Sequence, residues 1–210
     1  MRSSWRRRVI AVIVIAVALF PIALDSHAAG AFPEGDPVFP FTFRVDSVVN
    51  VKKFDQTIEV PGGTFVGGID LNTGEVEGDL SLPPTDFTFT LAGVGLVTAT
   101  AKMVPTQPVT GMIDFSHIPN LPMTATAVFN LLILDAHATG TNLNLVGDSC
   151  TTASPVSVTL SAMVNLQGPT SMSGEFTLPP FENCGLVTTT ALTLAISGPG
   201  NTFSATATPN

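Results

Sequence analysis

The amino-acid sequence predicts an all-β fold, an antiparallel β-sandwich or a closed β-barrel of about ten short strands. Apolar and polar residues alternate with a period of two through most of the chain after residue 38, the pattern of strands with one buried face. Glycine, proline and asparagine recur between these stretches, where turns are expected. Threonine is frequent at the polar positions, as in strands whose outer face meets water.

The first 28 residues have the layout of a secretory signal peptide. Arginines at 2 and 6–8 precede an apolar run over 9–24, and small residues at 26 and 28 then suit a signal peptidase. The run has 16 residues, fewer than the roughly 20 that a membrane-spanning helix needs. We therefore expect cleavage between Ala28 and Ala29, with an uncleaved anchor as the alternative. The mature protein would be secreted or extracellular, either free or retained at the cell envelope.

Cleavage would leave a strongly acidic chain. Four basic and 15 acidic residues would remain, which gives a formal charge of −11, and no lysine or arginine follows Lys102. Such a chain repels phosphate backbones and anionic headgroups, so we expect neither nucleic-acid binding nor electrostatic membrane binding. Trp5 is the only tryptophan and there is no tyrosine, which disfavours sites for sugars or quaternary ammonium groups.

The elements of the mature chain follow a flexible lead-in at 29–38 that is rich in glycine, proline and alanine. The alternation of phenylalanine with polar residues predicts a first strand over 39–49. A hairpin is expected next, because Gly74 between the alternating stretches 64–71 and 75–82 can take the positive φ of a tight turn. Further strands are expected over 86–91, 96–104, 109–115 and 123–134.

The pattern continues in the second half, and we expect 39–210 to form a single β domain. The clearest strand is 156–166, where apolar residues occupy every second position. Strands at 171–178 and 201–208 complete the chain. Residues 186–197 fit either a short helix or a strand: a Gly-Pro-Gly stop follows them, but three consecutive threonines are poor helix formers.

Two nearly identical heptads, GDLSLPP at 78–84 and GEFTLPP at 174–180, lie 96 positions apart. Each is preceded by turn residues, which predicts the return strand of a hairpin. The acidic residue would point outward, the two apolar residues inward, and the prolines would end the strand because they cannot donate to the ladder. The repeat predicts an internal duplication of two β halves, with two independent hairpins as the alternative.

Cys150 and Cys184 are the only cysteines. In an exported chain an even pair predicts a disulfide bond, with two buried free thiols as the alternative. The bond would close a loop of about 34 residues and stabilise the fold by on the order of 4 kcal/mol in the chain-entropy model.

The chain also resembles a family of secreted, β-rich actinobacterial proteins with no established activity. The resemblance is carried by the stretches GGIDLNTGEVEGDLSLPP, GDSCTTASPVSVTL, GEFTLPPFENCG and SGPGNT, with their two cysteines and Gly/Pro signatures. It covers most of the chain after the signal. It implies export and the disulfide bond, and nothing about catalysis.

One group of polar residues contains the residue types found in catalytic or metal sites. Asp135 and His137 share one face of a predicted strand, and Asp114, Ser116 and His117 lie nearby in the sequence. However, the chain has no G-x-S-x-G elbow and no paired metal-ligand spacing. We therefore interpret these residues as surface polar groups at strand ends, and we predict no catalytic, cofactor-binding or metal-binding residue.

A second group is acidic. Glu75, Glu77 and Asp79 alternate along one strand, and Asp70 lies on its predicted partner. Calcium takes clustered oxygen ligands, usually from a loop that wraps the ion, so a weak calcium site is the alternative here. Because these carboxylates would be about 7 Å apart along a strand, we favour a solvated acidic face.

The sequence favours an exported, non-enzymatic structural or binding module whose partner is an unknown envelope or extracellular protein. The alternative is a carrier of an apolar ligand, such as a lipid, inside a barrel or splayed sandwich, because the mature chain holds 13 phenylalanines and many aliphatic residues. A hydrolase is a second, disfavoured alternative. An interior cavity of several hundred cubic ångströms would favour the carrier, and a filled core would favour the structural or binding module.

Overall fold

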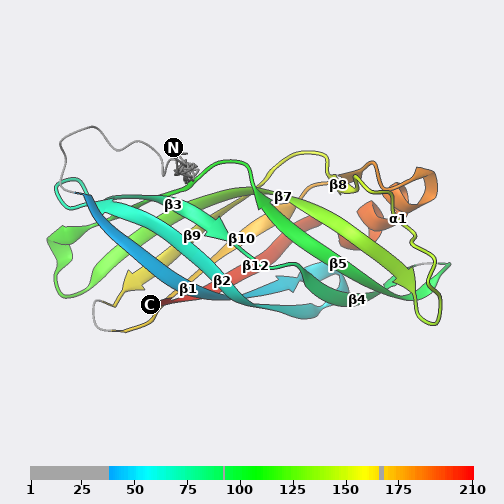
Figure 1. Ribbon diagram of the computed structural model, residues 1–210, viewed down its shortest axis with the longest axis horizontal. Coiled ribbons are helices and arrows are strands. Elements are labelled where there is room, and N and C mark those ends of the chain that lie inside the picture. The colour runs from blue at the N-terminus through cyan, green and yellow to red at the C-terminus, as the bar shows by residue number, and fades with distance from the viewer. Residues whose placement is uncertain (1–37, 92, 166–167) are drawn as a thin grey trace, which may run out of the picture.

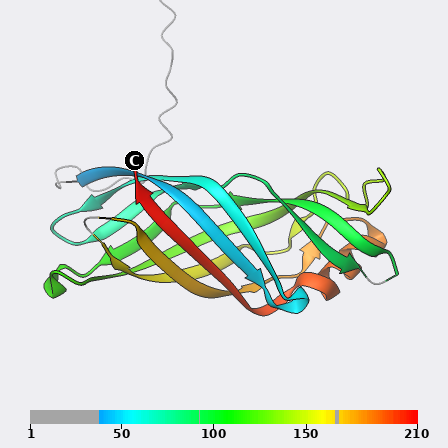
Figure 2. The ribbon, with the colours of Figure 1, turned by 90° about the horizontal axis from the view of Figure 1, so that it is seen from below.

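The computed structural model describes residues 38–91, 93–165 and 168–210. The predicted signal peptide, its cleavage site at Ala28–Ala29 and nearly all of the predicted lead-in lie outside this part. The all-β prediction is confirmed, and the barrel is the right one of its two alternatives. Figures 1 and 2 show an elongated barrel with one helix near one end. No helix of the described part is long and apolar enough to cross a membrane.

Eight strands make the closed barrel, and their order around it is their order along the chain. Each pairs antiparallel with the next, and β12 pairs with β1 over Phe43↔Pro209 to Asn50↔Thr202, which closes the ring. The eight are β1 (Val38–Val51), β2 (Gln56–Asp70), β3 (Glu75–Ser81), β6 (Val109–Ile113), β7 (Leu121–Ala138), β9 (Val156–Val164), β10 (Thr170–Leu178) and β12 (Gly198–Pro209).

Three insertions interrupt this meander. They are the hairpin β4 (Thr85–Leu91) and β5 (Gly95–Pro105), the β7–β9 connection with β8 (Thr151–Thr152), and the β10–β12 connection with β11 (Phe181–Glu182) and α1 (Leu186–Ile196). Since neighbouring strands run in opposite directions, all three leave the barrel at the end where β1 meets the 3₁₀ turn η1 (Lys52–Phe54). We call this end the capped end. The opposite end, the turn end, has the short turns, the 3₁₀ turn η2 (Phe115–His117) and the C-terminus (Figure 1).

Strand β7 connects the barrel to the cap because it is long enough to belong to both. Its first half pairs with β6 on one edge and with β9 on the other. Its second half continues beyond them and pairs with β5 from Pro105↔Phe129 to Val97↔Ala138, and with β8 at Leu132↔Thr151. The hairpin β4–β5 is therefore held on the barrel by an extension of one of the barrel's own strands.

The segment with two alternatives, 186–197, is the helix α1 over Leu186–Ile196. Its consecutive threonines, which disfavour a helix by propensity, make contacts outside it. The Thr188 hydroxyl donates to the Leu145 carbonyl (2.7 Å), and the Thr189 hydroxyl accepts from the Cys184 N–H (3.1 Å). Leu192 and Ile196 are buried beneath the helix. These tertiary contacts outweigh the weak local preference.

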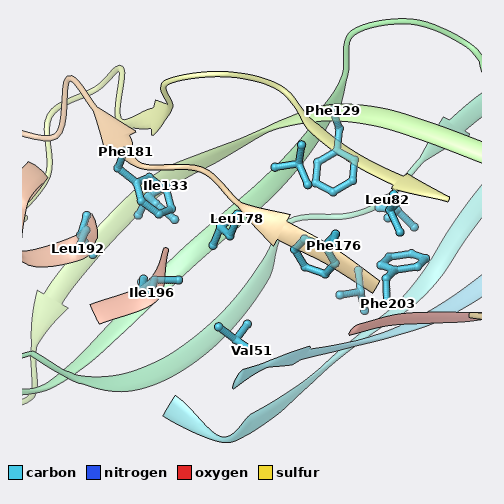
Figure 3. Close-up of a cluster of buried hydrophobic side chains, with 14 of the residues drawn as sticks. Val51, Leu82, Phe129, Ile133, Phe176, Leu178, Phe181, Leu192, Ile196 and Phe203 are labelled. Carbon is cyan, nitrogen blue, oxygen red and sulfur yellow. The ribbon is translucent and has the colours of Figure 1, made fainter. Parts of the chain in front are cut away.

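The barrel interior is apolar, as the alternation predicts. In β9, Val156, Val158 and Leu160 are buried, while Ser157 and Thr159 between them are exposed. Phenylalanine and leucine side chains from β7, β10 and β12 meet at mid-height, and residues of β11 and α1 extend this core into the cap (Figure 3).

The two heptads occupy matching places in the barrel. The first forms most of β3 and the second most of β10, which are the third and the seventh of the eight barrel strands. Both run toward the capped end, and in both the proline pair leads into an insertion. Leu82 and Leu178 are buried, and Asp79 and Glu175 are exposed, as predicted. Matching positions are what the duplication hypothesis requires.

The first residue of each heptad is a glycine because a neighbouring strand leaves no room for a side chain. A Cβ on Gly78 would lie 2.6 Å from the carbonyl oxygen of Val66 on β2. A Cβ on Gly174 would overlap the carbonyl oxygen of Thr159 on β9. In each case the obstacle is backbone, which cannot move aside as a flexible side chain can.

We predict that Gly174→Ala lowers the free energy of unfolding by about 2–3 kcal/mol, because the added methyl must push β9 away from β10. Ser173→Ala, at the exposed neighbouring position, is the control and should change it by less than about 0.5 kcal/mol. Urea unfolding followed by circular dichroism measures both. Equal stability of the two variants would contradict the close packing at Gly174.

Candidate functional site

The two predicted groups of catalytic-type residues lie far apart. The Asp114 N–H donates to the Pro122 carbonyl (2.9 Å), which places that group beside the start of β7 at the turn end. Asp135 lies 13 residues further along the same strand, a separation of about 40 Å at the rise of an extended chain. The structure therefore does not bring Asp114, Ser116 and His117 together with Asp135 and His137.

The group at the turn end is a cap for η2. Asp114 Oδ1 accepts hydrogen bonds from the Ser116 N–H (2.9 Å) and hydroxyl (2.6 Å), and Oδ2 lies 2.8 Å from His117 Nδ1. The Ser116 hydroxyl lies 2.9 Å from this same Nδ1. In a hydrolytic triad the imidazole uses one nitrogen for the serine and the other for the carboxylate. Here one nitrogen faces both, so the arrangement is that of a capping motif.

The second group forms part of a polar row on the cap. His137 Nδ1 lies 2.9 Å from Asp135 Oδ2, and both residues lie on the β7 extension. Thr100 is paired with Asp135, and its hydroxyl donates to Asp86 Oδ1 (2.6 Å) on β4. The Thr100 hydroxyl therefore binds the carboxylate of Asp86, whereas the His137 imidazole contacts a different carboxylate, that of Asp135.

The residues of the predicted acidic face do not all lie on the exposed surface in the structure. Asp70 is 1 % exposed, and its Oδ1 accepts from the N–H groups of Asn72 (2.7 Å) and Thr73 (3.3 Å), so it anchors the β2–β3 turn. The side chains of Glu75 and Asp79 are exposed on β3. Within the described ranges, no group of three or more His, Cys, Asp or Glu residues could hold a metal ion.

A hydroxyl-lined hollow of about 310 Å³ lies on the outer wall of the barrel over β1, β10 and β12. Its one charged residue is Asp46, whose Oδ1 accepts from the Gly62 N–H (2.9 Å) and lies 3.2 Å from an Arg44 nitrogen. These contacts, chiefly the Gly62 hydrogen bond, lower the pKa of Asp46. The carboxylate thus ties β1 to the glycine bulge of β2 as well as facing the hollow.

The predicted disulfide bond between Cys150 and Cys184 is confirmed. Both residues are buried at the capped end, where the bond links the β7–β9 connection to the β10–β12 connection. The two-residue strands β8 and β11 pair beside it through Phe181↔Thr152 and Glu182↔Thr151. The bond therefore holds two of the three insertions together.

Three apolar cavities that are lined by described residues lie inside the barrel. A cavity of about 70 Å³ lies beneath the cap, one of about 20 Å³ lies at mid-height, and one of about 50 Å³ lies toward the turn end. Phe203 lines all three. Each is far smaller than the roughly 300 Å³ at which ordinary ligand pockets begin.

The group of aromatic side chains beside the cavity that lies beneath the cap was not predicted from the sequence. Phe54 of η1 stacks on Phe87 and Phe89 of β4, with ring centroids 6.2 and 5.9 Å apart. The alternation in 86–91 correctly predicts that Phe87 and Phe89 share a face, but nothing local to Phe54 indicates that it reaches the same place. The contact exists because η1 and the hairpin lie at the same end of the barrel.

The chain matches no protein-family model, no curated protein sequence and no solved structure. The resemblance to secreted actinobacterial proteins and the predicted signal peptide therefore stay predictions. The disulfide bond is compatible with the predicted extracellular location, because such bonds persist in oxidising compartments.

We predict that reduction of Cys150–Cys184 lowers the free energy of unfolding by on the order of 4 kcal/mol, because it releases a loop of 34 residues. Hydrogen exchange should accelerate mainly over 139–155 and 181–197, while β1 and β2 stay protected. The double variant Cys150→Ala/Cys184→Ala is the control and should not respond to the reductant. Unchanged unfolding curves for the oxidised and reduced wild type would show that the bond does not stabilise the cap.

Asp114 provides a test of the capping motif at the turn end. The hydrogen bonds from Ser116 lower the pKa of Asp114. Its stabilising contribution is therefore present above its ordinary pKa of about 3.9 and is lost as pH falls through the lowered value. We predict that Ser116→Ala raises the pKa of Asp114, as measured by ¹³C NMR titration of the carboxyl group. An ordinary pKa in the parent protein would contradict the motif, and Ser173→Ala serves as the control.

Proposed function

We propose that this protein is an exported, non-enzymatic binding module of the cell envelope or extracellular space, and that it recognises a partner protein with the capped end of its barrel. The observation behind the proposal is that all three insertions of the barrel gather at this end. Connections carried on a rigid scaffold are where proteins usually place recognition.

The chemistry of the capped end indicates what kind of partner surface would fit. The helix α1 contains no charged residue, and its solvent-facing side exposes Val187, Thr190 and Leu194. Leu96 on the β4–β5 hairpin and Leu143 in the β7–β9 connection are exposed apolar residues of the other two insertions. A partner surface that covers α1 and these two leucines would be partly apolar, like the centre of ordinary protein interfaces.

Exposed apolar side chains alone do not distinguish the two ends. The turn end also exposes Phe39, Leu71 and Ile118. The difference is that the turn end is closed by short connections, while the capped end carries a hairpin, a helix and a disulfide bond. The capped end thus carries structure beyond what is needed to close the eight-stranded ring.

The alternative, a carrier with a ready-made lipid site, has less support. The largest of the three interior cavities is about 70 Å³, which no whole lipid fits without rearrangement of the interior. An interior without space for a whole lipid agrees better with a structural or binding module.

We predict that a photo-crosslinking residue in place of Leu96, at the capped end, forms one defined protein adduct in the cells that produce the protein. The matched control replaces Met163, which lies near the turn end and is similarly exposed, 55 % against 50 % for Leu96. Adducts are detected by a gel shift and identified by mass spectrometry. The proposal fails if Met163 gives the same adducts, or if neither position gives any.

A further inference from the structure

We propose that the cavity beneath the cap is a binding site for a compact, uncharged hydrocarbon group, which reaches it through a gap between β2 and β4. This inference goes beyond the proposed recognition by the cap's outer surface. It rests on a different observation, a side of the cavity where the edges of two strands lie close together without pairing.

The gap follows from the different lengths of β2 and β3. β2 runs over Gln56–Asp70, but β3 pairs with it only from Thr64↔Ser81 to Ile69↔Val76. The edge of β2 over 56–63 is therefore left without a strand on that side. β4 lies close to it, yet β4 pairs only with β5. Two unpaired strand edges thus face each other beside the cavity.

Side chains alone close this gap. Phe54, Ile58 and Phe87 line the cavity and are each partly exposed to solvent, so at this place the wall is one side chain thick. No backbone hydrogen bond has to break for these side chains to move apart. Partly exposed side chains change rotamer within picoseconds to nanoseconds, whereas opening a β-ladder is far slower.

The lining indicates the chemistry of the guest. Among the residues around the cavity, Thr85 alone has a polar side chain, and its hydroxyl already donates to the Pro83 carbonyl (3.3 Å). A charged or strongly hydrogen-bonding group placed there would lose its water and gain no partner. The other lining residues are aliphatic side chains, Met103, Pro83 and six phenylalanines, of which Figure 3 labels Phe129, Phe176, Phe181 and Phe203. The site therefore selects hydrocarbon.

The size of the cavity indicates a compact guest. Protein interiors hold only a few voids larger than a water molecule, and the cavity beneath the cap is the largest of these three. An engineered apolar cavity of about 150 Å³ stays dry and accepts benzene. At about 70 Å³, this cavity needs a modest shift of its lining. Met103, which separates it from the mid-height cavity, is a flexible side chain that can provide that shift.

Benzene is the probe for the experiment, and isoleucine methyl groups are the reporters. Of the isoleucines in the described part of the chain, Ile58, Ile133 and Ile196 line the cavity, whereas Ile69, Ile113 and Ile118 do not. In the full chain with labelled isoleucine methyls, we expect saturable shifts and NOEs from benzene at the three lining residues. Ile69, Ile113 and Ile118 should show neither. No response up to the solubility limit of benzene, or an equal response at all six, would overturn the proposal.

Two variants test the site and the route separately. Ala101→Leu adds a side chain to the wall of this cavity and should weaken benzene binding at least tenfold, while Ala207→Leu beside the cavity near the turn end should change it less than twofold. Phe87→Ala should speed benzene association at least tenfold, whereas the exposed Leu134→Ala should leave it unchanged. The methyl spectra verify that each variant is folded. Full binding in Ala101→Leu would overturn the site, and an unchanged association rate in Phe87→Ala would overturn the route.

Discussion

The pairing of the first barrel strand with the last is the constraint on which the rest of the structure depends. β12 must lie along β1 over eight residue pairs, from Phe43↔Pro209 to Asn50↔Thr202. Once this ladder forms, each barrel strand has a neighbour on both sides over at least part of its length, and inward side chains face one another across the same interior. The ladder joins residues more than 150 positions apart in the chain, so it brings the first and the last strand of the barrel side by side.

Closure also explains why the two ends of the molecule differ. In a meander of eight strands, successive connections alternate between the two ends of the barrel. An insertion therefore lies at the end where the connection that carries it is found. All three insertions leave at the end where α1 and the disulfide bond lie, so they can contact one another. The extension of β7, the Cys150–Cys184 bond and the threonine hydroxyls of α1 then join them into one cap over the barrel. The gap beside β4 follows from the same arrangement, because the hairpin extends the sheet along β7 and not along β2.

Much of the fold could be predicted from the sequence because the alternation of apolar and polar residues is a local property of each strand. The Val156–Val164 strand and the β2–β3 hairpin with Gly74 at φ +83° agree closely with their predicted ranges. The first half of β2 was missed because Pro61, Gly62 and Gly63 resemble a turn. In the structure Pro61 and Gly62 form a bulge opposite Asp46. Proline has no N–H to donate, and it is tolerated at this position because β3 does not extend along this part of β2.

The candidate site depended more on tertiary structure than the fold did. Composition and spacing were sufficient to predict the disulfide bond, because two cysteines allow a single pairing, and to leave Asp114, Ser116 and His117 as surface groups. They could not indicate that Phe54 meets Phe87, or that the cavities form a row past Phe203. The sequence by itself determined most of the barrel strands, the β2–β3 turn and the covalent link, since these follow from neighbouring residues and from one pair of thiols. Only the tertiary structure decided between sandwich and barrel, between helix and strand at 186–197, and where the interior stays open. These depend on contacts between segments far apart in the chain, which no local pattern records.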